Sequence, residues 1–551
     1  MLMKKSKWLA LAGVSLLSVG VLVACSSKSN TSSNTYNYVY TADPETLDYL
    51  ISNKGSTTDA VTNGVDGLLE NDKYGNLVPA IAKDWTVSAD GLTYTYKLRK
   101  GVKWYTSDGE EYAEVTAKDF VTGLKHAADK KTESIYLAKD SVVGLADYFN
   151  GTDKDFSKVG VKALDDYTLQ YTLKQPEPYW NSKMTYSLFW PVNEEFLKSK
   201  GDSFGKSTDP SSILYNGPYI LKSLTAKSSI ELAKNENYWD KKNVHYDGVK
   251  LSFFDGSDQE AQVRNFTDGA YSQARIYPTG SNFASVKKQY KDNIFYTQPS
   301  ADIVGVGVNI DRQSYNHTSK KTDAEKDSTK KALLNKDFRQ SVNFAIDRTA
   351  YSAQLNGEKG AALAVRNLLV KPDFVYAGDK SFGDLVTEKM ASYGDEWSGV
   401  NLKDSQDGLF NAGKAKTEFN KAKEALQAQG VQFPIHLDMP VDQTAKTKVA
   451  RAQSLKQSVE ETLGKENVVV DLNQMSQDDL LNATLSAPNA AAEDWDITDS
   501  VAWAPDYEDP STYLDIFKTT ASENTKTYMG FDDPNNAAAA QVGLKDFDAL
   551  V

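Results

Sequence analysis

Three acidic residues near the end of the chain follow a predicted strand, at a place where a carboxylate could bind a cation. The run Asp494–Trp503 is predicted as a strand, and Asp506, Glu508 and Asp509 come soon after it. Open α/β sheets bind ligands at the carboxyl ends of their strands, where a carboxylate can accept charge-assisted hydrogen bonds from an ammonium group. Asp509 precedes Pro510, which is typical of a helix cap followed by proline. We interpret Asp509 as a cap and Glu508 as solvated, while Asp506 has no capping role at that spacing.

The chain contains no complete catalytic motif. Gly201–Gly205 fits the G-x-S-x-G pattern of a nucleophile elbow, but no apolar strand leads into it and no amphipathic helix follows. A phosphate-binding loop ending at Ser207 fails because Lys200 stands in place of its first glycine. The four histidines lack metal-ligand spacing: His126, His245, His317 and His436. We therefore expect no catalytic residue, no cofactor and no metal site, although a glycosidase pair of acids stays open because its separation is three-dimensional.

The single cysteine lies at the end of an export signal. Three lysines precede the apolar stretch Trp8–Val23, which is too short to span a bilayer comfortably. The residues Leu22-Val-Ala-Cys25 match the bacterial lipoprotein box, in which the cysteine is lipidated and becomes the new N-terminus. We expect residues 1–24 to be a removed signal peptide, residues 25–35 to be a flexible tether, and Cys25 to carry acyl chains that hold the protein at a membrane.

The composition describes a packed protein with an acidic surface. Of 551 residues, 40% are hydrophobic and 25% charged, and the formal net charge is −13. This balance argues against sequence-independent nucleic-acid binding, which needs an excess of clustered Lys and Arg. One cysteine also excludes an internal disulfide and an all-cysteine metal cluster.

Strand and helix signals alternate along the rest of the chain, which indicates an α/β fold. A polar stretch, His317–Lys330, is predicted to be an exposed loop. Gly430 follows one predicted helix, where it can end the helix in the left-handed conformation. The predicted elements are strands at 37–40, 92–99, 435–439 and 468–470, and helices at 416–429 and from about 445 to 464.

Several motifs follow one another across almost the whole chain. They are Leu77–Trp85, Ser88–Trp104, Thr116–Phe120, Pro191–Asn193, Asn216–Tyr219, Asn235–Trp239, Phe338–Arg339 leading to Ala345–Arg348, and Trp503–Pro510. In this order they resemble the large extracytoplasmic solute-binding proteins of oligopeptide and dipeptide ABC importers, family 5. The lipoprotein signal and the lack of disulfides resemble the oligopeptide-binding lipoproteins of Gram-positive bacteria, streptococcal ones in particular.

The resemblance implies a two-lobed α/β clamshell of the periplasmic-binding-protein type. Lobe I would be discontinuous, from residues 36–75 and 210–310, with an inserted accessory domain at 76–209, and lobe II would be residues 311–551. Such a protein would be a monomer that captures oligopeptides in the cleft, breaks no bond, and delivers them to a permease with ATPase subunits. It would be anchored to the extracytoplasmic face of the cell membrane through its N-terminal lipid.

The resemblance also implies roles for particular residues. In the family, the acid of a Trp-x-x-Asp motif takes the peptide's α-ammonium group, and Trp503 and Asp506 match that motif here. Main chain near Ala502 and Ala504 would hold the peptide backbone. Some members have an Arg three residues before the Trp, where it meets the carboxylate of a short peptide, but this chain has Ser500 there. We therefore expect longer or variable-length ligands.

Two alternatives stay open at this point. The same fold could bind another solute, such as a nickel complex or a sugar, or the chain could be a lipid-anchored hydrolase or adhesin. The sequence stops at Asp546–Val551, whereas family members continue with a helical stretch and a segment that returns to lobe I. We expect the chain to be truncated inside lobe II, without that return segment.

Overall fold

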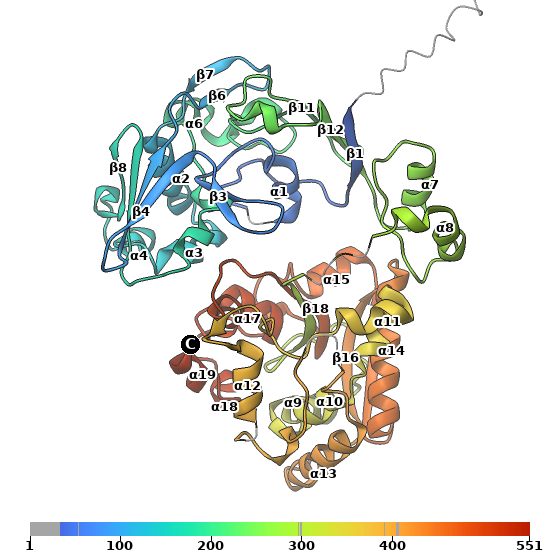
Figure 1. The fold of residues 1–551 in the computed structure, drawn as a ribbon. Helices are drawn as coiled ribbons and strands as arrows, with labels where there is room; N and C mark the ends of the chain where they lie inside the picture. Colours follow the sequence, from blue (N-terminus) through green and yellow to red (C-terminus); the bar gives the residue numbers. More distant parts are fainter. Residues whose placement is uncertain (1–33, 53, 296, 298–299, 391, 404–406) are drawn as a thin grey trace, which may run out of the picture.

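The computed structural model describes residues 34–551 apart from 53, 296, 298–299, 391 and 404–406. Figure 1 shows two bodies, which we call the first lobe (34–295) and the second lobe (303–551). Cys25 and the predicted signal peptide lie outside the described residues, as does the tether up to residue 33. Within the described part of the chain, no helix is long and apolar enough to cross a membrane.

A four-stranded sheet of the first lobe joins the start of the described chain to residues far along it. Its order is β1-β12-β11-β10, with β1 (Thr35–Tyr40) parallel to β12 (Gly248–Phe253). The other two strands, β10 (Tyr219–Thr225) and β11 (Ser229–Lys234), are antiparallel neighbours. Because β1 and β10 belong to one sheet, the roughly 180 residues between them form an excursion from it.

A second four-stranded sheet lies inside that excursion, in the order β4-β5-β9-β8. Its strands are β4 (Ala82–Val87), β5 (Thr93–Leu98), β8 (Val161–Asp165) and β9 (Thr168–Thr172). Tyr94, Tyr96 and Leu98 alternate inward from β5, so the period-two strand predicted at 92–99 is confirmed. Tyr96 meets Tyr171 edge to face inside an aromatic core.

The motif Asn235–Trp239 is a structural junction of the first lobe. The Tyr238 hydroxyl and the Trp239 indole N–H donate to Oδ2 of the buried Asp66, at 2.8 and 3.1 Å. Arg99, which directly follows β5, lies over the Trp239 ring, 4.3 Å from its centroid, so the motif ties the two sheets together. Burial raises the pKa of Asp66 to about 7, although both hydrogen bonds oppose the rise.

The remaining elements of the first lobe are short. Its strands are β2 (Leu69–Asn71), β3 (Leu77–Pro79), β6 (Lys103–Tyr105) and β7 (Glu111–Glu114). Its helices are α1 (Gly55–Val61), α2 (Ala117–Asp129), α3 (Tyr136–Lys139), α4 (Leu145–Asn150), α5 (Trp180–Lys183), α6 (Glu194–Lys200), α7 (Ala261–Thr267) and α8 (Phe283–Tyr290).

Two strand pairs form the centre of the second lobe. The buried, valine-rich β17 (Val468–Met475) runs parallel to β16 (Ile435–Asp442). The antiparallel pair is β13 (Ile303–Val308) with β18 (Ile497–Trp503), and a bulge interrupts it between Gly305 and Gly307. β13, which the predicted boundary at 311 places in the first lobe, pairs here with β18.

Helices surround these strands (Figure 1). They are α9 (Asp323–Leu334), α10 (Lys336–Ala345), α11 (Arg348–Ala361), α12 (Phe382–Met390), α13 (Ala412–Ala428), α14 (Lys446–Leu463), α15 (Gln477–Ala483), α16 (Ser511–Leu514), α17 (Ser522–Met529), α18 (Ala537–Gln541) and α19 (Leu544–Leu550), with a small hairpin of β14 (Tyr376–Ala377) and β15 (Lys380–Ser381). The predicted helices are confirmed as α13 and α14. Gly430, with φ of 76°, follows α13 as expected.

The prediction that His317–Lys330 is an exposed loop is wrong. Its second half forms most of α9, whose start carries a capping box between Thr322 and Glu325. In its first half, the Lys320 side chain is 0% exposed and its ammonium group donates to Asp438 (2.7 Å) and to Asp496. One charge that indicated a solvated loop, that of Lys320, is therefore used in the interior, while the charged residues of α9 are exposed or half-buried.

Arg312 completes this buried ion network beneath the second lobe's strands. Its guanidinium donates to Asp438 and Asp494 at 2.7 Å each, and it lies 3.0 Å from Asp496. Burial opposes ionisation of Asp438, yet Lys320 and the surrounding donors hold the pKa of this carboxyl well below its usual range. Three carboxylates and two cations thus fix the segment after β13 to β16 and to the start of β18.

Candidate functional site

The candidate site begins where β18 ends. Trp503 is half-buried, and its indole N–H donates to the Thr512 carbonyl at 2.8 Å. The Asp506 N–H donates to the Thr512 hydroxyl oxygen at 2.8 Å. Asp509 Oδ1 accepts from the Ser511 N–H at 3.0 Å, so Asp509 has the capping contact predicted for it, although α16 begins one residue later than expected. These bonds fold the loop back onto α16.

The Asp506 side chain points across to the first lobe. The residue is only 8% exposed, and its Oδ2 accepts a hydrogen bond of 2.6 Å from the Tyr136 hydroxyl. Its Oδ1 accepts from the hydroxyl of Tyr186. The tyrosines precede Asp506 by 370 and 320 residues, and both lie in the excursion from the first-lobe sheet. The candidate acid therefore lies at the contact between the two lobes.

Burial decides the electrostatics of this carboxyl group. It raises the pKa of Asp506, while hydrogen bonds from Tyr136 and Tyr186 and the charge of Lys183 lower it. Burial and the nearby carboxylate raise the pKa of both tyrosines, which therefore stay protonated as donors. An ionised carboxylate has about four acceptor positions and these phenols use two, so the site could still bind an ammonium group.

Tyr507, the next residue, docks on the first lobe. Its ring stacks on Tyr179 with centroids 4.9 Å apart, and the Lys183 ammonium lies 4.7 Å from its centroid. Its hydroxyl donates to Asp515 at 2.6 Å, within its own lobe. The ring packs with the first lobe's buried hydrophobic residues, so this side chain of the second lobe is part of the first lobe's hydrophobic core.

Lys183 is held in place beneath that ring. Its ammonium donates to Glu177 at 2.8 Å and to the Ser141 hydroxyl at 3.2 Å, and both charged side chains are buried. A further bond joins the lobes, from the Glu508 N–H to the Ser182 hydroxyl at 3.2 Å. The Glu508 residue itself is exposed, in agreement with the interpretation as a solvated acid.

The other predicted binding residues lie beside this contact. Ala502 and Ala504 are exposed, and Ala502 pairs with the exposed Val304 of β13. The Ala502 carbonyl accepts a 2.8 Å hydrogen bond from the Tyr528 hydroxyl, so this main-chain group already has one partner. Trp503 packs against Ile303 and the buried Tyr513, and also against the cluster that contains Tyr528.

Sequence reasoning missed the first-lobe half of the site. No motif marked Tyr136, Tyr179, Lys183 or Tyr186, because tyrosine is abundant in this chain and nothing local shows which rings face the other lobe. Among the described residues, no group of three or more His, Cys, Asp or Glu could hold a metal ion.

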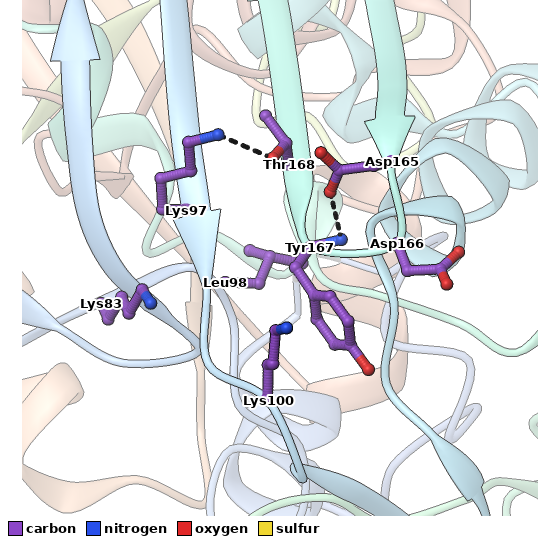
Figure 2. A pocket seen from close by; sticks show the side chains of 8 residues that line it. All are labelled: Lys83, Lys97, Leu98, Lys100, Asp165, Asp166, Tyr167 and Thr168. Atoms are coloured by element: carbon purple, nitrogen blue, oxygen red, sulfur yellow. Dashed lines mark hydrogen bonds between the residues drawn. The ribbon is translucent and has the colours of Figure 1, made fainter.

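Two cavities lie elsewhere on the surface. One, of about 380 Å³, is lined by Lys83, Lys97, Lys100 and Asp165 with their neighbours (Figure 2). Its lysines make no ion pair within the described residues, but Lys97 donates to the Thr168 hydroxyl at 2.8 Å. The other, of about 410 Å³, lies between α11 and α14. Neither cavity includes a residue of the Asp506 contact.

Comparison with known proteins identifies the class of the chain. The family model "Bacterial extracellular solute-binding proteins, family 5 Middle" matches residues 76–525. The chain is 68% identical to the oligopeptide-binding protein AmiA of Streptococcus pneumoniae and 63% identical to the oligopeptide-binding protein SarA of Streptococcus gordonii, covering all of this chain and 84% of each relative. These matches favour a solute-binding protein over the hydrolase and adhesin alternatives.

A solved structure has the same fold. It is the substrate-binding domain of an oligopeptide ABC transporter from Bacillus anthracis, at 25% identity and a TM-score of 0.67, covering 90% of this chain and 84% of that one. The predicted α/β clamshell of the periplasmic-binding-protein type is thereby confirmed. The chain belongs to the bacterial extracellular solute-binding proteins of family 5.

Proposed function

We propose that this protein captures oligopeptides between its lobes and delivers them to an ABC import permease with ATPase subunits. The names of its relatives support the cargo, because proteins 56–68% identical to this chain are oligopeptide-binding proteins. The observation that carries the proposal is the position of Asp506 at the contact between the lobes: its buried carboxylate accepts hydrogen bonds from two first-lobe tyrosines, while its backbone N–H is bonded to Thr512 of its own lobe.

Asp506 would accept the peptide's α-ammonium group. Every peptide with a free N-terminus offers this cation whatever its sequence, so a single buried carboxylate suits a binder of many peptides. Main chain at Ala502 and Ala504, which are both exposed residues, would bond the peptide backbone as an added strand does. Trp503 would support the loop, since its indole N–H holds the Thr512 carbonyl.

Closure of the lobes would retain the ligand. A ligand that contacts both lobes favours the closed state by its difference in binding free energy between the open and closed states. The inserted domain (76–209) would form the wall opposite Asp506, because Tyr136, Tyr179, Lys183 and Tyr186 all belong to it. Residues 36–75 with 210 to about 300 would form the rest of the first lobe.

Lipidation of Cys25 would keep the protein on the extracytoplasmic face of the membrane. Two or more acyl chains give stable anchoring, since each buried methylene contributes about 0.8 kcal/mol. A Cys25→Ala variant should leave the membrane fraction and appear in the medium. Retention of that variant in washed membranes would contradict the anchor.

The binding experiment compares the purified protein with its Asp506→Asn variant. Native mass spectrometry should find co-purified peptides on the parent protein, and calorimetry should show that the variant binds a synthetic hexapeptide library at least about tenfold more weakly, because a hydrogen bond to a charged group contributes about 1.5–3 kcal/mol. Acetylation of the peptide N-termini should weaken binding to the parent protein by a similar factor. Equal affinity of the parent protein and the Asp506→Asn variant would refute the proposed role of Asp506 in binding the peptide's ammonium group.

A further inference from the structure

Both oxygens of the Asp506 carboxylate accept a hydrogen bond from a tyrosine of the other lobe. Tyr136 of α3 donates to Oδ2 at 2.6 Å, and Tyr186, in the turn after α5, donates to Oδ1. We infer that Tyr136 and Tyr186 are positioning residues for the ligand anchor: they orient the Asp506 carboxylate, favour its ionised form, and complete the anchor only when the lobes meet. This inference rests on the proposed role of Asp506.

The two phenols differ from an ion pair in a way that suits a binding site. They donate to the carboxylate without adding positive charge, so the charge of Asp506 remains available for a ligand's ammonium group. Lys183 is the cation whose charge acts on Asp506, but its ammonium is already bonded to Glu177 and Ser141. The carboxylate is therefore hydrogen-bonded but not neutralised by a direct cationic partner.

The other groups around the carboxylate come from its own lobe. The Asp506 N–H is held by Thr512 of α16, which fixes the backbone from which the side chain projects. Tyr528 of α17 is close enough for Asp506 to raise its pKa, which burial and this carboxylate together bring to about 12, but its hydroxyl donates to the Ala502 carbonyl instead. Among the hydrogen bonds of the described residues, the side-chain donors to Asp506 all come from the first lobe.

This division of donors couples ligand binding to closure. In an open form, Asp506 would lose both phenols and regain water, and its carboxylate could rotate freely. In the closed form, each oxygen has one phenol donor and one acceptor position left, so an ammonium group could bond the carboxylate through the remaining positions. A ligand amine thus gains the oriented carboxylate only when the inserted domain is in place.

Tyrosine-to-phenylalanine variants test this role with little change in packing. Tyr136 is 40% exposed and Tyr186 is half-buried, so a phenyl ring can keep the apolar contacts of either while the hydroxyl is lost. Tyr148→Phe is a matched control, since this tyrosine of the same domain donates its hydroxyl to the exposed Asp129 at 2.5 Å. Thermal unfolding of each variant should match the parent protein.

The readout is the affinity for a synthetic hexapeptide library, measured by calorimetry from pH 4 to pH 8. The Tyr136→Phe, Tyr186→Phe double variant should bind about 10- to 100-fold more weakly at neutral pH, while Tyr148→Phe stays at the parent value. The phenols lower the Asp506 pKa, so their loss should raise it. Binding of the double variant should then be lost at a higher pH than in the parent as the solution is acidified.

Two outcomes overturn the inference in different ways. If Asp506→Asn weakens binding but the double variant keeps both the parent affinity and the parent pH profile, the anchor stands and the positioning role fails. If Asp506→Asn itself binds like the parent, the proposed anchor fails and the positioning role fails with it. Weaker binding with an acid limb moved to higher pH supports the inference, because a purely structural loss would not move that limb.

Discussion

Tyr507 of the second lobe stacks on Tyr179 of the first, with ring centroids 4.9 Å apart and an interplanar angle of 17°. The two residues are separated by more than 300 positions, and the Lys183 ammonium lies 4.7 Å from the Tyr507 centroid. This contact joins the loop after β18 to the inserted domain beside Asp506. Two adjacent residues of the second lobe therefore contact the first lobe. Tyr507 does so by ring stacking, and Asp506 by hydrogen bonds to its carboxylate.

Replacing Tyr507 by Ala should weaken closure without touching the Asp506 carboxylate. An aromatic pair contributes about 0.5–1.5 kcal/mol beyond its buried area and a cation–π contact about 0.5–2 kcal/mol, so we expect peptide affinity to fall by about fivefold to a few hundredfold. Small-angle X-ray scattering should show a larger radius of gyration for the variant. Tyr507→Phe, which keeps the ring, should lie close to the parent protein.

Tyr74→Ala provides the control for a lost tyrosine, because Tyr74 is 77% exposed in the first lobe. It should change neither affinity nor scattering. If Tyr507→Ala behaves like Tyr74→Ala in both measurements, the ring does not stabilise the closed form.

The buried ion network predicts a large effect of Lys320→Met on stability. Lys320 is 0% exposed and bonds Asp438 and Asp496, so its removal leaves buried carboxylates with one cation fewer. Breaking a buried pair in this way costs about 3–5 kcal/mol. Urea unfolding of the second lobe should shift to lower denaturant by a corresponding amount.

Lys331→Met is the matched control from the helix that follows. The Lys331 ammonium lies 2.7 Å from Asp327, but both side chains are exposed to solvent. Such a surface pair contributes about 0–1 kcal/mol. If both variants lower the free energy of unfolding equally, the buried ion pairs of Lys320 contribute no more to stability than an exposed pair.

Asp66 predicts a pH-dependent difference between the parent protein and Asp66→Asn. Its pKa is about 7 when folded against 3.8 as a free group, so the folded state binds more protons between these values and the parent loses stability as pH rises through that window. The Asn side chain can accept from Tyr238 and Trp239 without a charge. We expect Asp66→Asn to be more stable than the parent at pH 8, by up to about 4 kcal/mol, and the difference to shrink towards pH 4.

Thermal unfolding at a series of pH values measures this difference. A variant that is less stable than the parent at every pH would show that the Asp66 carboxylate is needed for its hydrogen bonds, whatever its ionisation.

Because Ser500 stands where some family members have an Arg, we expect the peptide's C-terminal carboxylate to contribute little to the binding affinity. Amidation of that terminus should change the affinity of the hexapeptide library by less than about twofold, whereas loss of a fixed carboxylate clamp would cost about tenfold or more. Calorimetry with free and amidated peptides of equal sequence compares the two cases. A tenfold loss on amidation would point to a cationic partner other than residue 500.

Local sequence signals predicted several elements correctly. The alternation at 92–99 predicts β5 because a half-buried strand repeats every two residues, and α13 follows from apolar spacing ended by Gly430. The polar run at 317–330 was misread because composition reports charge and not its partners. Lys320 is buried because Asp438 and Asp496, far along the chain, face it in the fold.

The sequence by itself determined the α/β class and pointed to the acid on which the candidate site is centred. Asp506 could be selected because its position after a strand and within a motif is local information. Only the tertiary structure decided what faces that acid: Tyr136 and Tyr186 bond its two oxygens, and Tyr507 stacks on Tyr179. These partners lie more than 300 residues away, and nothing in a local pattern records which side chains meet when two lobes close.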